Sequence, residues 1–225
     1  NFSTLHINAQ RPPYGSHYRR ESLLADKLDL LILNQGKQKI VFYGGCSMWY
    51  NLDGPVMRDA VSPDYQVVNV AVNGLINSAV QMQIITALLE EGDIFFHTPE
   101  LSSEQQMLCQ MGFTADDSKL WCGLEYNYDL VSYVDIRETP GLLDSYQVWR
   151  DRKQETGNYD EHYEDAAGNI YFDPGTGSIP FDRYKQEDEL VDKVNITMER
   201  VRPENLARLE VYYRAITAKG VRVYV

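Results

Sequence analysis

Two nucleophilic side chains follow an apolar run and a pair of glycines early in the chain. Residues 40–43 are Ile, Val, Phe and Tyr, and the sequence continues as Gly44, Gly45, Cys46 and Ser47. A short apolar run bounded by glycine is typical of a buried strand, and glycine permits a tight turn at its end. A thiol or hydroxyl placed there lies where open α/β sheets bind ligands. An ordinary strand-to-helix turn with a buried cysteine has the same pattern, so both interpretations stay open.

Two further turns with polar residues follow apolar runs later in the chain. Residues 66–72 are rich in valine and lead into Asn73 and Gly74, and residues 93–97 lead into a turn that contains Glu100. The carboxyl ends of parallel strands lie at one edge of a sheet, where α/β proteins bind ligands. We therefore expect both turns to lie beside the two nucleophiles.

Apolar periodicity places these turns in a repeating order of strands and helices. Strands are expected over 39–43, 66–72, 93–97 and 221–225, and helices over 20–34, 75–90, 102–111, 141–153, 186–201 and 203–219. A short helix is also expected near Ser47, interrupted at Gly54-Pro55. Successive strand–turn–helix units imply an α/β fold with a parallel sheet and right-handed crossovers.

The length of 225 residues suits one domain, which we expect to span 1–225. Residues 1–18 are expected to form an irregular arm, and residues from about 155 to 182 a surface insertion. Valine at alternate positions of 221–225 predicts an interior strand beside residues 93–97. An interior strand at the end of the sequence predicts that the native chain continues past Val225.

Composition and charge exclude several classes of function. Hydrophobic residues make up 44% of the chain and charged residues 24%, which is typical of a globular protein. The net charge of −12 argues against nucleic acids and anionic membrane surfaces as partners. No apolar run is long enough to cross a membrane, so membrane attachment would need a segment outside this chain. No glycine-rich phosphate loop and no metal-ligand spacing is present, and neither a cofactor nor a metal is expected.

Taken in order, the three turns resemble the sequence blocks of the SGNH (GDSL-like) hydrolase superfamily. Gly45-Cys46-Ser47 resembles the first block, a strand that ends in Gly-x-Ser. Residues 69–74, Asn-Val-Ala-Val-Asn-Gly, resemble the second block, and Gly-Asp-Ile-Phe-Phe at 92–96 resembles the strand before the third. Typical members then carry Gly-x-Asn-Asp. Thr98-Pro99-Glu100 at this place resembles a divergent branch linked to bacterial cell-envelope polysaccharides and teichoic acids.

The resemblance implies a three-layer α/β/α sandwich with a parallel, flavodoxin-like sheet. It also implies an extracytoplasmic ester hydrolase or O-acyltransferase whose substrate is an acylated carbohydrate or envelope polymer. Ser47 would attack the ester carbonyl, and the backbone N–H groups of Ser47 and Gly74 would line the oxyanion hole. Gly45 and Asn73 would lie around the substrate.

Two features of the first and third blocks depart from the family pattern. Glu100 stands near the position of the usual asparagine, and an ionised carboxylate accepts hydrogen bonds but donates none. If Gly44-Gly45-Cys46 is the true counterpart of Gly-x-Ser, the thiol of Cys46 becomes the nucleophile. We favour Ser47, because that alignment needs no change of residue type.

The general base is the part of the expected triad that this sequence lacks. The family carries Asp-x-x-His near its carboxyl end, and no such motif occurs here. Of the four histidines, His6, His17, His97 and His162, His97 ends the third predicted strand and could reach the edge of the site, but we favour a structural or solvated role for each. Two functions therefore stay open. One is an enzyme completed by residues beyond Val225, in which case residues 1–225 alone hydrolyse esters poorly. The other is a binding or scaffold protein that keeps the fold without the triad.

Overall fold

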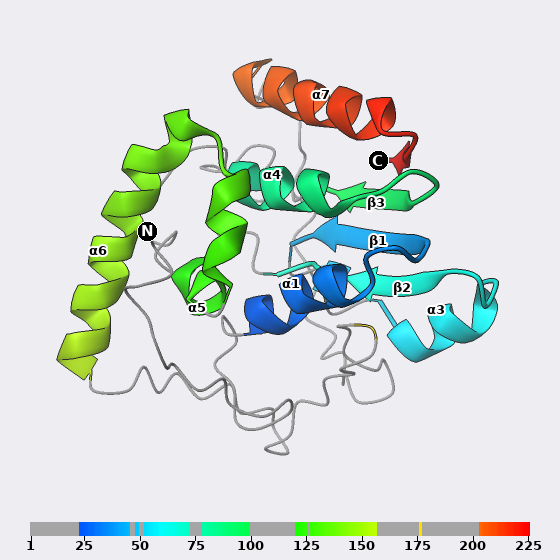
Figure 1. Ribbon diagram of the computed structural model, residues 1–225, viewed down its shortest axis with the longest axis horizontal. Coiled ribbons are helices and arrows are strands. Elements are labelled where there is room, and N and C mark those ends of the chain that lie inside the picture. Colours follow the sequence, from blue (N-terminus) through cyan, green and yellow to red (C-terminus); the bar gives the residue numbers. More distant parts are fainter. Residues whose placement is uncertain are drawn as a thin grey trace, which may run out of the picture.

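The computed structural model describes residues 23–45, 48–49, 52–72, 78–99, 120–125, 127–156, 176 and 203–225. Within these ranges a four-stranded parallel sheet lies between helices (Figure 1). The elements are α1 (Leu23–Leu33), β1 (Lys39–Gly44), α3 (Gly54–Ala60), β2 (Gln66–Asn69), α4 (Ser78–Leu88), β3 (Ile94–Thr98), α5 (Trp121–Leu124), the 3-10 helices η3 (Tyr128–Tyr133) and η4 (Ile136–Glu138), α6 (Thr139–Thr156), α7 (Pro203–Ala218) and β4 (Arg222–Tyr224). The predicted α/β class is confirmed.

The strands lie in the order β2-β1-β3-β4, and each neighbouring pair is parallel. This order matches the first four strands of the flavodoxin-like arrangement. All six residues of β1 are buried, which places this strand at the centre of the sheet. The sequence predicted both the parallel sheet and its flavodoxin-like type, and the structure shows both.

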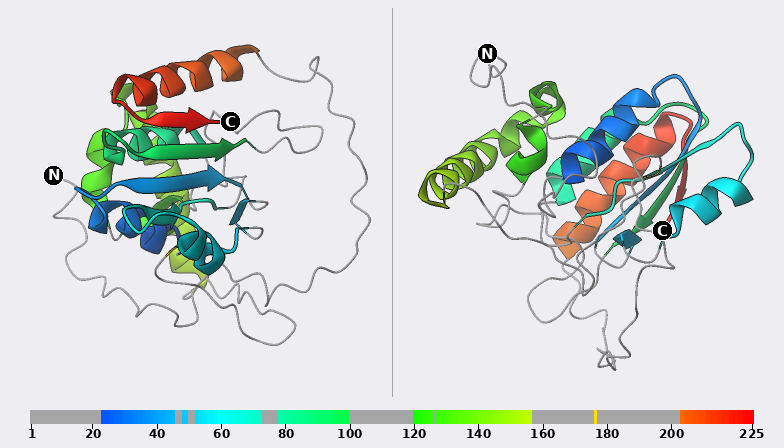
Figure 2. Two further views of the ribbon diagram at one scale, coloured as in Figure 1. Left: turned by 90° about the vertical axis from the view of Figure 1, so that its right-hand side faces the viewer. Right: turned by 90° about the horizontal axis from the view of Figure 1, so that it is seen from below.

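Helices cover both faces of the sheet, which gives three layers (Figure 2). On one face α3 packs against Ile40, Phe42 and Val67. On the other face α1, α4 and α7 pack against the side chains that alternate with these along the strands, among them Val41 and Phe95. The outward α5 and α6 lie beyond α1, farther from the strands (Figure 2). Alternating side chains therefore divide the core into a large cluster and a small one, as period-two strands require.

The amino ends of β1 and β3 are joined by a buried ionic network. Lys39 has no exposed side-chain surface, and its ammonium lies 3.1 Å from Asp93 and 2.7 Å from Glu90. The Asp93 carboxylate also accepts hydrogen bonds from the backbone N–H of Lys39 at 2.8 Å and of Glu90 at 2.9 Å. Buried charges are tolerated when they are paired and hydrogen-bonded in this way. The network fixes the register of the two central strands at their amino ends.

The start of α3 differs from the sequence prediction. We expected Gly54-Pro55 to interrupt a helix, but the helix begins there. The Asp53 side chain caps it by accepting a hydrogen bond from the N–H of Val56 at 3.0 Å. Proline is favoured in the first helical turn, where its missing N–H has no intrahelical partner to lose. The helix at 48–49 is therefore interrupted before Gly54 as expected, and the new helix that begins there was not predicted. The expected helices at 102–111 and 186–201 lie outside the described residues.

The position of β4 confirms one prediction and corrects another. The strand pairs with β3 as expected, but it ends the strand order among the described residues and is therefore an edge strand. Tyr224 is 47% exposed and Val225 75% exposed. The alternating valines reflect burial on one face only, since Val221 and Val223 belong to the large cluster. On the other face Tyr224 stacks on Phe96 with ring centroids 4.8 Å apart.

Gly44 lies in close contact with Thr98 at the end of β3. A Cβ atom built on Gly44 would lie 2.4 Å from Oγ1 and 2.8 Å from the carbonyl oxygen of Thr98, and 2.9 Å from Cβ of Met48. Real Cβ atoms do not approach other atoms so closely, and one of these neighbours is backbone. Glycine is therefore required at this position by space.

Substituting Gly44 tests this close approach. We expect Gly44→Ala to lower the free energy of unfolding by about 1–3 kcal/mol, because overpacking a filled site forces backbone shifts. Urea unfolding followed by circular dichroism measures the change. The double variant Gly44→Ala/Thr98→Ala should recover only part of the loss, since the carbonyl contact remains. An unfolding midpoint equal to that of the unsubstituted protein would show that the two strands do not meet so tightly.

Candidate active site

Three strand ends meet at the carboxyl edge of the sheet. Gly44 at the end of β1 pairs with Thr98 at the end of β3. Beyond the last residue of β2 the backbone continues alongside β1: Val70 donates its N–H to the carbonyl oxygen of Phe42 at 2.8 Å, and Val72 donates to that of Gly44 at 3.3 Å. The residues directly before the three predicted turns are therefore neighbours. The prediction that the first three strands share this edge is confirmed.

The predicted site residues follow these strand ends in the sequence. Gly45 is buried, and its carbonyl oxygen accepts a hydrogen bond from the N–H of Trp49 at 3.1 Å. This four-residue spacing is that of an α-helical turn directly after the strand. The other five predicted site residues, Cys46, Ser47, Asn73, Gly74 and Glu100, lie outside the described residues. Their roles stay predictions.

Successive strands are added first on one side of β1, as β2, and then on its other side, as β3 and β4, so the direction in which the sheet is extended reverses between β1 and β3. The connection from β1 to β2 runs through α3 on one face, and the connection from β2 to β3 runs through α4 on the other. Open α/β sheets bind ligands in the crevice that such a reversal leaves outside the carboxyl ends of the strands. Gly44, Gly45 and Thr98 lie at this point. The first predicted turn therefore follows the strand end best placed to meet a ligand.

His97 lies close to this edge but points into the helical layer. The side chain is 1% exposed and stacks on Tyr43 with ring centroids 4.9 Å apart. Its Nδ1 atom lies 2.7 Å from the hydroxyl of Tyr213 in α7. Burial lowers the pKa of His97 to about 4, so the imidazole is neutral at pH 7. These contacts place His97 in the core, where it joins β3 to α7.

Lys27 is a buried titratable group that the sequence analysis missed. Its side chain is fully buried in α1, and its ammonium donates to the carbonyl oxygen of Asn69 at 3.3 Å. The same atom lies 5.3 Å from the ring centroid of Trp49. Burial lowers the pKa of Lys27 well below its usual value, and the charge of Asp26 opposes this only in part. A signal existed, because Lys27 lies within the run of Leu24 and Leu28 that marks the apolar face of the helix.

Asn69 holds the backbone that leads to the second predicted turn. It is fully buried, and its side-chain oxygen accepts a hydrogen bond from the N–H of Ala71 at 2.9 Å. Its own N–H donates to the carbonyl oxygen of Thr176 at 2.7 Å. Thr176 is 1% exposed, although it falls within the segment at about 155–182 that we expected to form a surface insertion. At this residue the segment packs beside β2, and residues 157–175 and 177–182 lie outside the described ranges.

Metal and membrane features were also searched within the described ranges. No group of three or more His, Cys, Asp and Glu side chains there is arranged to hold a metal ion. No helix in that part of the chain is both long enough and apolar enough to cross a membrane.

Comparison with models of protein families, with curated proteins and with solved structures gave no match for this chain. The resemblance to the SGNH hydrolases is therefore one of sequence blocks alone. The structure adds the flavodoxin-like strand order and the meeting of three strand ends.

The depressed pKa of His97 predicts a pH-dependent contribution to stability. Between pH 6.5 and 4 the unfolded chain binds a proton at this residue and the folded chain does not, so the free energy of unfolding falls as the pH falls. His97→Phe keeps the ring but cannot titrate. From pH 7 to pH 5, we expect the free energy of unfolding of the unsubstituted protein to fall by about 2 kcal/mol relative to that of the variant, measured by urea unfolding. A difference that stays constant over this range would contradict the neutral, buried imidazole.

Lys27→Met tests the cost of burying the lysine. Because the folded-state pKa is lowered, stability is lost as the pH falls below 10.5. We expect the variant to be more stable at pH 7 by about 1–3 kcal/mol, since an apolar side chain of similar length replaces a buried amine. The difference in the free energy of unfolding between the variant and the unsubstituted protein should be smaller at pH 10. The exposed Lys37 provides a matched control, and Lys37→Met should change stability by less than about 0.5 kcal/mol. Destabilisation by Lys27→Met would show that the contacts with Asn69 and Trp49 outweigh the burial cost.

Proposed function

We propose that this protein is a serine ester hydrolase or O-acyltransferase that acts on an acylated carbohydrate or cell-envelope polymer. Ser47 is the proposed nucleophile, and Cys46 the alternative. One observation carries the proposal: the ends of β1, β2 and β3 meet at the point where the strand order reverses. The three sequence blocks that resemble SGNH hydrolases follow those ends.

The local geometry after β1 supports a nucleophile at this place. The strand is buried, Gly44 lets it approach β3 and Met48 closely, and the carbonyl oxygen of Gly45 accepts a hydrogen bond from the N–H of Trp49. Strand–turn–helix is the context in which α/β hydrolases expose a nucleophilic side chain. Backbone N–H groups at such a turn can serve as donors to a developing oxyanion.

The source of the general base distinguishes the two functions that the sequence left open. His97 and Lys27 are the described groups near this edge whose pKa values are lowered, and a lowered pKa favours the neutral form that can accept a proton. Both side chains are buried, so we assign the proton transfer to neither. This burial favours the second candidate function, a binding or scaffold protein that keeps the fold without catalysis.

Substitution of the two candidate nucleophiles tests the proposal in the full-length natural protein. We expect Ser47→Ala to lower the rate of p-nitrophenyl acetate hydrolysis by about a thousandfold or more, as loss of a triad nucleophile does. A fluorophosphonate probe should label the unsubstituted protein and fail to label this variant. Cys46→Ala should keep both signals, and so should Ser62→Ala, which removes an exposed hydroxyl beyond α3.

Two other outcomes would redirect the proposal. Activity lost in Cys46→Ala and kept in Ser47→Ala would make the thiol the nucleophile. Neither turnover nor labelling in the full-length protein would contradict an enzyme and favour the binding or scaffold protein.

A further inference from the structure

A surface pocket of about 450 Å³ lies at the C-terminal ends of α1 and α4. Ile32 of α1, Leu88 of α4 and Leu130 of η3 supply its apolar wall, and the two leucines belong to the large core cluster. Because α1 and α4 lead directly into β1 and β3, the pocket is at the amino ends of these strands. It is therefore separate from the candidate active site at the carboxyl edge. Its volume is within the range of small-molecule sites.

The polar groups that line the pocket are rich in hydrogen-bond acceptors. Asp129 contributes an exposed carboxylate. Asn127 donates through Nδ2 to the carboxylate of Asp29 at 2.7 Å, which leaves its amide oxygen to accept a hydrogen bond and places a second carboxylate beside the pocket. Gln35 adds another amide. An acceptor-rich lining favours a ligand that donates hydrogen bonds.

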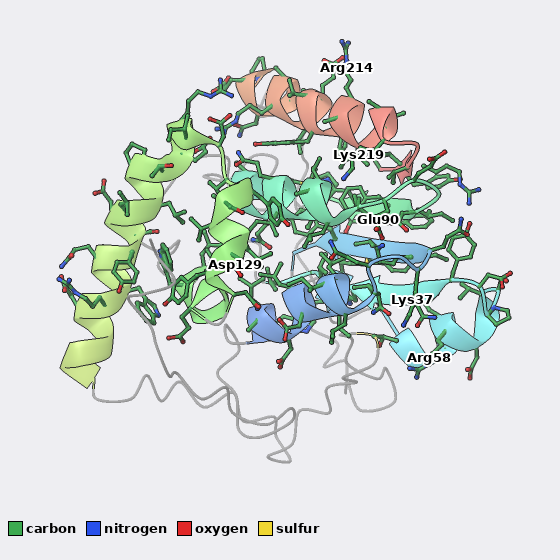
Figure 3. All side chains as sticks on the ribbon, in the orientation of Figure 1. Lys37, Arg58, Glu90, Asp129, Arg214 and Lys219 are labelled. Atoms are coloured by element: carbon green, nitrogen blue, oxygen red, sulfur yellow. The ribbon has the colours of Figure 1, made fainter. Side chains whose placement is uncertain are left out.

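No positive charge balances Asp129 in the described part of the chain. None of the residues that line the pocket is Lys, Arg or His, and α1 has no basic residue in its last turn. Lys219 donates to the carbonyl oxygens of Thr86 and Ala87, and Lys37 to the side chain of Asn34. Figure 3 shows Asp129 well apart from both labelled lysines and from the labelled arginines. Among the described residues, the lining of the pocket therefore carries a net negative charge.

Two tyrosine rings complete the lining. Tyr128 packs against Trp121 with ring centroids 6.2 Å apart, which fixes its orientation, and Tyr133 is 44% exposed. The face of an aromatic ring carries partial negative charge and attracts a cation within about 6 Å. The rings therefore favour the same ligand charge as the carboxylate does.

We propose that this pocket binds a primary ammonium ion carried on a small apolar or aromatic body. The ammonium lies at the carboxylate of Asp129 and the amide oxygen of Asn127, to which its three N–H groups can donate. The apolar body lies against Ile32, Leu88 and Leu130. The carboxylate of Asp129 and the acceptor-rich lining select a cation, and the apolar wall selects an organic one over a hydrated metal ion.

Benzylamine and benzyl alcohol provide a matched pair of probes, because they share shape and differ in charge at pH 7. Isothermal titration calorimetry on the full chain should show saturable binding of benzylamine and at least tenfold weaker binding of benzyl alcohol. Asp129→Asn keeps the side-chain shape and should weaken benzylamine binding about tenfold, the usual effect of losing a hydrogen bond to a charged group. It should leave benzyl alcohol unchanged.

The control is Asp144→Asn, which neutralises an exposed carboxylate on α6 outside the pocket and should leave benzylamine binding unchanged. Thermal unfolding of both variants shows whether each is folded. Equal binding of the two probes, an equal loss in both variants, or no saturable binding of benzylamine would each overturn the proposal. The result is independent of Ser47, since the pocket and the candidate active site lie at opposite ends of the strands.

Discussion

The close approach of β1 to β3 at Gly44 is the constraint on which the carboxyl edge depends. Because Gly44 has no side chain, Thr98 of β3 and Met48 can both pack directly against its backbone. A side chain here would push β3 away from β1 and open the place where the strand order reverses. Ligands of α/β sheets bind at that reversal. The geometry of any site here therefore depends on the lack of a side chain on Gly44.

The two ends of the central strands are held by different interactions. At the amino end, Lys39 is buried against the carboxylates of Asp93 and Glu90, so electrostatics and hydrogen bonds fix the register. At the carboxyl end, backbone contacts around Gly44 fix the separation of the strands. The ionic network therefore lies at the end where α1 and α4 lead into the strands, and the three predicted turns follow the opposite end. Loops that carry function at one end of a rigid scaffold follow the same division.

Local sequence patterns predicted the elements but not every feature that depends on tertiary contacts. Apolar runs bounded by glycine predicted β1 and β3, because burial and the conformational freedom of glycine are local signals. The beginning of α3 was missed, because Gly54-Pro55 suits a helix break and a first turn equally and only the cap by Asp53 decides. The edge position of β4 depends on which strands pair, which alternation of valines cannot reveal. The predicted site residues, apart from Gly45, fall where the structure offers no test.

Two lysines buried at opposite edges of the sheet have different surroundings, and Lys27 is the one at the carboxyl edge. Its ammonium is held by the carbonyl oxygen of Asn69 and the ring of Trp49, and burial lowers its pKa. Lys39, at the other end of the sheet, has two carboxylates beside it. A leucine or methionine at position 27 would pack in the same run of apolar residues without the desolvation cost. The desolvation cost of Lys27 is therefore carried between Trp49 and the end of β2, at the carboxyl edge of the sheet.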